Sequence, residues 1–106
     1  MTPEMVRVQE SLNGKNGEDA QRIAAAGVEV LSMLLRKNRD YGSSAFQEPV
    51  LAPGMKPRQA MQCRMSDKVA RLSTLMSGQQ AEVDESIRDT MSDLAGYIIL
   101  WLSTDQ

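Results

Sequence analysis

The chain has 106 residues, of which 42% are hydrophobic, and its formal charge is −2. This length fits a single domain, and the negative balance argues against a protein that coats nucleic acid through bulk charge. With no His and a single cysteine, Cys63, the chain has no intramolecular disulfide and lacks the ligands of a structural zinc site, so any bound metal should prefer oxygen ligands, as Mg²⁺ does.

Two helices are expected in the first part of the chain. Residues 3–12 predict a short helix, because Thr2 is a suitable N-cap and Pro3 suits a first turn. An Asn- and Gly-rich turn follows. Residues 18–38 predict a long helix with one broad apolar face. That face contains Ala20, Ile23, Ala24, Val28, Leu31, Leu34 and Leu35.

Residues 39–55 form a long loop, because Pro49, Pro53 and Gly54 forbid a long helix there and no apolar period is present. Long ordered loops in small domains are often functional, although a simple connector is the alternative. Residues 56–76 predict a third helix. Its apolar stripe is Met61, Met65, Val69, Leu72 and Met76.

The last predicted helix, residues 82–104, begins with acidic residues and becomes apolar nearly all round from Gly96 onward. Its expected core stripe is Val83, Ile87, Met91, Leu94, Ile98 and Trp101. Burial on two sides points to a partner subunit as well as to the chain's own core. The apolar run 94–102 is too short to span a bilayer, and residues 1–11 lack the apolar core of a signal peptide. We therefore expect a cytoplasmic protein with no membrane contact.

The predicted fold class is all-α. We expect an antiparallel helical bundle of three long helices plus a short N-terminal helix, in one domain over residues 1–106, completed by oligomerisation.

Three clusters of residues could carry chemistry. The first is Lys37, Asn38, Asp40, Tyr41 and Gly42 at a helix end, with Phe46 nearby. The second is Arg64, Asp67, Lys68 and Arg71, with cations at spacings suited to phosphate. The third is Glu85, Asp89 and Asp93, three carboxylates on one helix face that could hold Mg²⁺.

Each cluster also has a purely structural interpretation. Tyr41 and Phe46 could cover the end of the core, and the second cluster could be a ladder of ion pairs along one helix. The third cluster lies opposite its own helix's apolar stripe, so it could be a solvated face. It becomes a site only if another helix or subunit covers it. Covalent catalysis by a nucleophile is disfavoured, because Cys63 has no His to act as its base.

The segments KNRDYGSSAF, RMSDKVARLSTL and DESIRDTMSDLAGYIIL occur in an order that resembles the nucleotide-modification-associated domain family of phages and bacteria. That family is in turn similar to the MazG-like all-α NTP pyrophosphatases. The resemblance covers about residues 31–101. It implies a nucleotide ligand, Mg²⁺, and a homo-oligomer in the cytoplasm, which for a phage protein is the host's.

Individual roles follow from the same resemblance. It implies that Glu85 and Asp89 are catalytic and bind the metal, to which the carboxylate spacing adds Asp93. It makes Lys68, Arg64 and Arg71 candidates for phosphate contacts, and Asp40 and Tyr41 candidates for the rim of the site. Lys37, the basic residue of the first cluster, is a further candidate for binding the ligand. The acidic motif is incomplete, because the 18–38 helix offers only Glu29 where the MazG pattern has EExxE.

These observations leave three functions open. The first is a nucleotide-binding protein that acts as a magnesium-dependent NTP pyrophosphohydrolase, giving a monophosphate and pyrophosphate. The second is a non-catalytic binder that sequesters a nucleotide or cyclic-nucleotide signal, as an anti-defence sponge does. The third is a protein-interaction module that contacts a host or virion protein.

Overall fold

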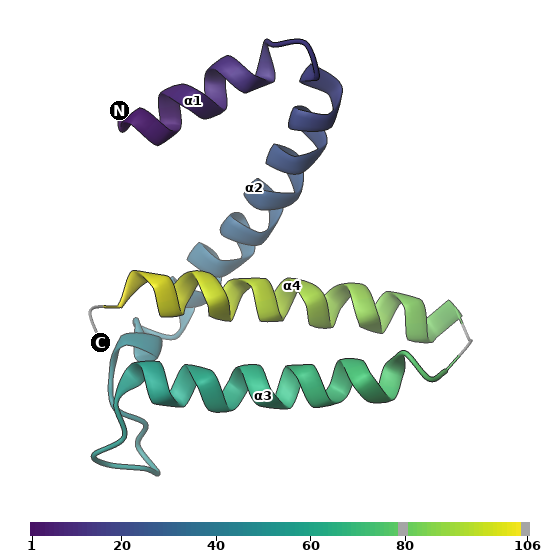
Figure 1. The fold of residues 1–106 in the computed structure, drawn as a ribbon. Coiled ribbons are helices and arrows are strands. Elements are labelled where there is room, and N and C mark those ends of the chain that lie inside the picture. Colours follow the sequence, from purple (N-terminus) through teal and green to yellow (C-terminus); the bar gives the residue numbers. More distant parts are fainter. Residues whose placement is uncertain (79–80, 105–106) are drawn as a thin grey trace.

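The structure is a computed structural model that describes residues 1–78 and 81–104, with the side chains of residues 81–85 outside the description. It contains four α-helices: α1 (Pro3–Leu12), α2 (Gly17–Asp40), α3 (Pro57–Leu75) and α4 (Ala81–Ser103). A short 3₁₀ helix, η1 (Ser44–Phe46), lies in the loop between α2 and α3. The described residues form no strand, which confirms the all-α class (Figure 1).

The helix boundaries agree with the sequence prediction to within two residues. The Oγ1 atom of Thr2 accepts a hydrogen bond of 3.1 Å from the Met5 amide, so Thr2 is the predicted N-cap of α1. At the start of α3, Pro57 occupies the first turn and the side chain of Gln59 accepts from the Lys56 amide at 3.0 Å. Local capping therefore accounts for where these helices begin.

The helices pack less evenly than the predicted bundle. As Figure 1 shows, α3 and α4 form an antiparallel pair. The C-terminal half of α2 crosses α4, and the N-terminal half of α2 projects away from the pair. At the far end, α1 folds back onto α2. The radius of gyration is 16.5 Å, against about 13 Å for a compact chain of this length. A single closed bundle is therefore not confirmed.

The core is small and lies where α2, α3 and α4 meet. Leu34, Met61 and Leu100 form its buried cluster. Partly buried residues pack around the cluster: Ala45, Tyr97, Ile99 and Trp101. Because this core draws on three helices and η1, it fixes the end of α2 against the α3–α4 pair.

The predicted core stripe of α4 is confirmed only in part. The stripe residue Val83 lies outside the described side chains. Trp101 packs on the core, but Met91 and Ile98 are 43% and 44% exposed, while Thr90 and Leu100, outside the predicted stripe, are buried. The cause is that α4 packs against both α3 and α2, so the residues that face the space between these two helices are the ones that become buried. Thr90 is accommodated there because its hydroxyl donates to the Ser86 carbonyl at 2.7 Å.

Only part of the broad apolar face of α2 is buried. Leu34 is buried, but Val28 and Leu35 are 63% and 60% exposed. On α3, Met61 and Leu72 are buried as predicted, whereas Val69 is 55% exposed. None of the helices in the described part of the chain combines the length and the hydropathy that a bilayer crossing needs.

Arg58 joins the start of α3 to the end of α4 through several contacts. The guanidinium of Arg58 lies 4.0 Å from the centre of the Trp101 ring. The same group donates to the Thr104 hydroxyl at 2.7 Å and to the Thr104 carbonyl at 2.8 Å. The start of α3 is thereby tied to the last turn of α4.

Candidate functional site

An ion-pair cluster joins the three long helices. Lys37 in the last turns of α2 places Nζ 3.5 Å from Oδ1 of Asp93 on α4. Lys68 on α3 places Nζ 3.2 Å from Oδ2 of the same carboxylate. The side chains of Asp93 and Lys68 are each only 28% exposed. Two ammonium groups thus face one carboxylate, which leaves an excess of one positive charge.

A cavity of about 290 Å³ opens beside this cluster, between the end of α2, α3 and α4. Its wall combines apolar and polar side chains. The residues that line it are Met33, Leu34, Lys37, Asn38, Tyr41, Ser44, Ala45, Arg64, Asp93, Gly96, Tyr97 and Leu100. This volume is near the lower end of the range for pockets that bind small molecules.

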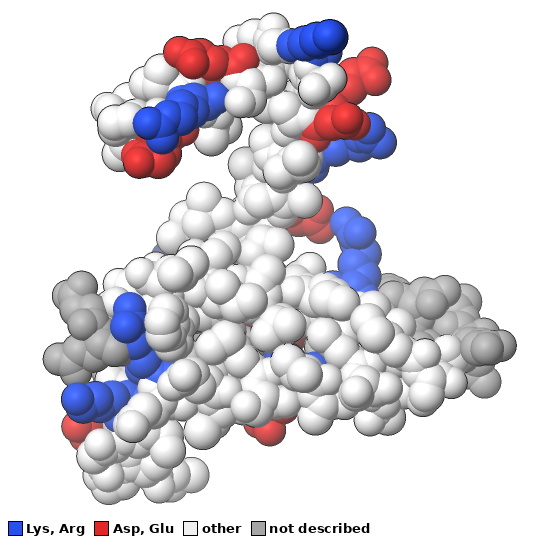
Figure 2. Space-filling view, in the orientation of Figure 1, with Lys and Arg blue, Asp and Glu red and all other residues white. Residues whose placement is uncertain are grey.

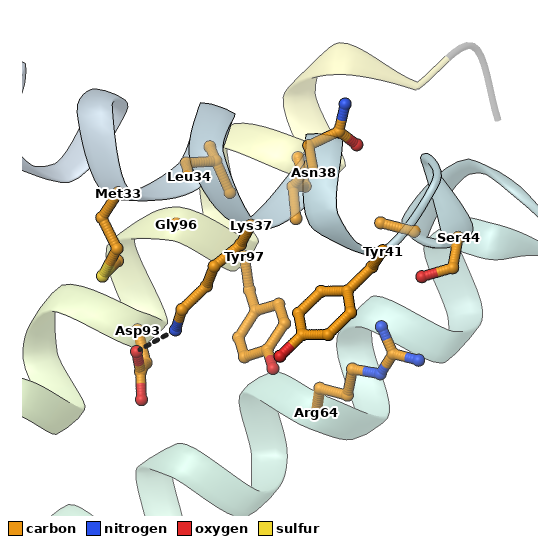
Figure 3. Close-up of a pocket in the computed structure, with 12 residues that line it drawn as sticks. Met33, Leu34, Lys37, Asn38, Tyr41, Ser44, Arg64, Asp93, Gly96 and Tyr97 are labelled. Carbon is orange, nitrogen blue, oxygen red and sulfur yellow. Dashed lines mark hydrogen bonds and ion pairs between the residues drawn. The ribbon is translucent and has the colours of Figure 1, made fainter.

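Two tyrosines and an arginine meet at the mouth. Figure 3 shows the rings of Tyr41 and Tyr97 pointing into the same space, with Arg64 reaching toward them from α3. Tyr41 is 69% exposed, so its ring is available to a ligand. No ion pair involving Arg64 is present among the described residues. The mouth therefore offers aromatic surface and a cation together.

The cavity wall includes Gly96. A Cβ atom at this position would lie 3.6 Å from Cδ1 of Leu34 and 4.0 Å from Cε of Met33. An alanine would make ordinary contacts here, whereas a larger side chain would crowd Leu34 and Met33 at the cavity wall.

The start of the 39–55 loop shapes the rim. Gly42 and Ser43 both have φ of 59°, which reverses the chain directly after α2. The side chain of Asn38 donates to the Ser43 hydroxyl at 3.3 Å, and the Ser43 amide donates to the Asn38 carbonyl at 3.0 Å. This turn holds Tyr41 at the mouth and brings Ser44 to the cavity wall. The first part of the loop thus belongs to the site.

Of the residues in the three predicted clusters, five line the cavity together: Lys37, Asn38, Tyr41, Arg64 and Asp93. Lys68 joins them through Asp93. Asp40 is not part of the cavity wall, and its Oδ1 atom lies 3.8 Å from Nε of Arg39. Arg71 is exposed and is not part of the cavity wall.

Two acids of the predicted ladder border the same second, more open hollow: Asp89 and Asp93, together with Glu29 and Ser92. Asp93 also lies between the two lysines. Oε2 of Glu29 on α2 lies 3.8 Å from Nη2 of Arg88 on α4, so the two side chains form an ion pair. The side chain of Glu85 lies outside the described residues. Thus α2 does cover part of the acidic face, at Asp93.

The described side chains do not form a metal cage. Among them, no group of three His, Cys, Asp or Glu residues is placed to hold an ion. Both oxygens of Asp93 already face an ammonium group. A divalent cation there would have to displace a lysine.

Six cavity residues were missed by sequence reasoning: Met33, Ser44, Ala45, Gly96, Tyr97 and Leu100. Tyr97 and Gly96 stand inside an apolar run, which reads as core, and Met33 lies between two faces of its helix. A tyrosine with a polar hydroxyl in such a run was the available clue, because a buried phenol needs a partner or a cavity.

Comparison with family models gives one finding that bears on this site. A model described as "Nucleotide modification associated domain 1" matches residues 37–103. This segment begins at Lys37 and contains every polar residue of the cavity wall. Comparisons with curated proteins and with solved structures gave no match.

Proposed function

Because the chain belongs to the nucleotide modification associated domain 1 family, we propose that it binds a nucleotide in the cavity between α2, α3 and α4. One observation carries the proposal: Lys37, Lys68 and Arg64 gather beside two tyrosines at a single cavity. Cations beside aromatic rings can recognise a phosphate and a base at the same time.

Each group has a role in this proposal. Arg64 contacts the phosphate, because its guanidinium offers several donors in one plane and it is close to the mouth. Lys37 and Lys68 supply the remaining positive charge, and Asp93 holds their ammonium groups in place. Tyr41, which is exposed at the rim, stacks on the base.

Calorimetry and thermal unfolding with a panel of mono- and triphosphates, in EDTA, test this proposal. A ligand at 100 times its dissociation constant should add about 2.7 kcal/mol to the free energy of unfolding. If no nucleotide raises the melting temperature or releases heat, nucleotide binding is wrong for this protein.

A second candidate is the magnesium-dependent NTP pyrophosphohydrolase that a MazG-like relationship implies. Asp89 and Asp93 favour it, because they border one hollow with Glu29 facing them from α2. The described donors do not form a cage, so we derive no reaction step through a metal. Pyrophosphate release from NTPs with Mg²⁺ separates this candidate from a binder, since a binder gives a thermal shift in EDTA and no pyrophosphate.

A further inference from the structure

The chain exposes far more surface than a folded monomer of its size. Its accessible area is 8153 Å² for 11.7 kDa. A typical monomer of this mass exposes about 5,900 Å². The excess of about 2,200 Å² falls within the area that one subunit of an obligate dimer buries. Much of the exposed surface here is apolar, so a partner of substantial size is needed.

The most regular part of this surface is a stripe on α2. Ala24, Val28, Leu31 and Leu35 follow one another at spacings of four, three and four. This is the spacing of the apolar seam in a coiled coil. Val28, Leu31 and Leu35 are 63%, 43% and 60% exposed, so most of the seam is left uncovered by the described part of the chain, while Ala24 is partly covered. A helix is therefore the element that fits it.

The seam is complementary to itself when one copy is reversed. If two α2 helices run antiparallel about a point between Glu29 and Val30, Val28 of one copy meets the partner's Leu31. In the same register the small Ala24 meets the large Leu35. A twofold axis requires this kind of self-matching surface, and an unrelated partner would not.

Charge favours the same orientation. The first turn of α2 carries Glu18 and Asp19, whereas its last turn carries Lys37 and Arg39. An antiparallel pair brings the acidic end of each helix to the basic end of the other, and it places Glu18 beside the partner's Arg39. A parallel pair would bring like charges together.

The space around the seam also suits a second helix. Figure 2 shows α1 overhanging the α3–α4 pair, with largely uncharged surface beside α2 beneath it. α1 packs on α2 near Ala20 and Ala24. Met5 and Val8 of α1 remain 57% and 52% exposed, so they offer further apolar contact at that corner.

We propose that the chain is a homodimer in which the α2 seams of two copies pack antiparallel about a twofold axis. This interface lies outside the ligand cavity, so its test is separate from the test of nucleotide binding.

Analytical ultracentrifugation of the full chain tests the assembly. The expected result is a species of twice the chain mass at micromolar concentration. Leu31→Glu should raise the dissociation constant of the dimer at least about 100-fold, because the change places an unpaired charge in the seam twice. The matched control is Leu51→Glu, at a loop residue that is 97% exposed, and it should leave the dimer unchanged. A monomeric wild type, or an unaltered dimer for Leu31→Glu, would overturn the proposal.

Cysteine cross-linking tests the orientation even if Leu31→Glu fails to fold. In a Cys63→Ala background, Val28→Cys and Leu31→Cys chains are oxidised separately and as a mixture. Antiparallel seams predict that the mixed disulfide forms faster than either homodimeric one. Faster linkage of Val28→Cys to itself would indicate a parallel pair and contradict the proposed axis.

Discussion

The ammonium of Lys68 on α3 lies 3.2 Å from Oδ2 of Asp93 on α4, while Lys37 reaches the other oxygen from α2 at 3.5 Å. One carboxylate therefore links three helices beside the cavity, and its removal separates the two proposed functions.

Asp93→Asn should lower the free energy of unfolding by only about 1 kcal/mol, because partly exposed ion pairs contribute little. Nucleotide binding should persist, since the net positive charge of the site rises. The measurements are thermal unfolding and calorimetry. Loss of binding would show that Asp93 itself contacts the ligand, whereas loss of pyrophosphate release alone would favour the magnesium enzyme.

Arg64→Met should weaken nucleotide binding by about 10- to 150-fold, the equivalent of roughly 1.5–3 kcal/mol for a hydrogen bond to a charged group. Arg71→Met is the matched control, because Arg71 is on the same helix, is exposed and is not part of the cavity wall. Calorimetry should show that the control retains wild-type affinity. Equal losses in both variants would place the phosphate farther along α3.

Tyr41→Ala should reduce nucleotide affinity by about 1–3 kcal/mol, the range for stacking between a base and an aromatic ring. The melting temperature should change little, because Tyr41 is already 69% exposed. Binding of inorganic pyrophosphate, which has no base, is the control and should be unaffected. If the two ligands weaken together, Tyr41 has a structural role at the rim instead.

Gly96→Val should abolish binding without altering any charged group, because its side chain would occupy the space beside Leu34 and Met33. Gly96→Ala should be tolerated, since its Cβ would make an ordinary contact of 3.6 Å. Circular dichroism checks that both variants keep their helicity. Full binding by a folded Gly96→Val variant would place the ligand outside this cavity.

Arg58→Ala should lower the free energy of unfolding by about 1–3 kcal/mol, because it removes a cation–π contact and hydrogen bonds to Thr104. Arg58→Lys should recover only part of this loss, since an ammonium lacks the planar fork of donors. Thermal unfolding measures both variants. Complete rescue by lysine would show that charge alone matters at this position.

The sequence predicted the helices well because their ends depend on local chemistry. Thr2, Pro57 and the turn at Gly42 act within a few residues of themselves. The sequence could not predict how α4 is rotated, because a helix between two neighbours buries a face that its own apolar period does not mark. Thr90 illustrates this, since it is polar and lies outside the apolar period of α4, yet it is buried.

The candidate site was also predicted only in part, because the sequence shows local patterns and not how the helices pack. Lys37, Arg64 and Lys68 could be identified from charge and spacing alone. Their meeting with Asp93 depends on the crossing of α2 over α4, which no short-range pattern encodes. Tyr97 and Gly96 were missed because their neighbours in the sequence are apolar, whereas their neighbours in space include the cavity.

Helix α2 runs without interruption from Gly17 to Asp40 and contains no proline. Val28 in the proposed seam and Lys37 at the cavity are thus about 13 Å apart along one stiff rod, at 1.5 Å per residue. A tilt of this rod at one end displaces the other. If a ligand changes the tilt, it must alter the association constant of the dimer by the same factor by which association alters ligand affinity.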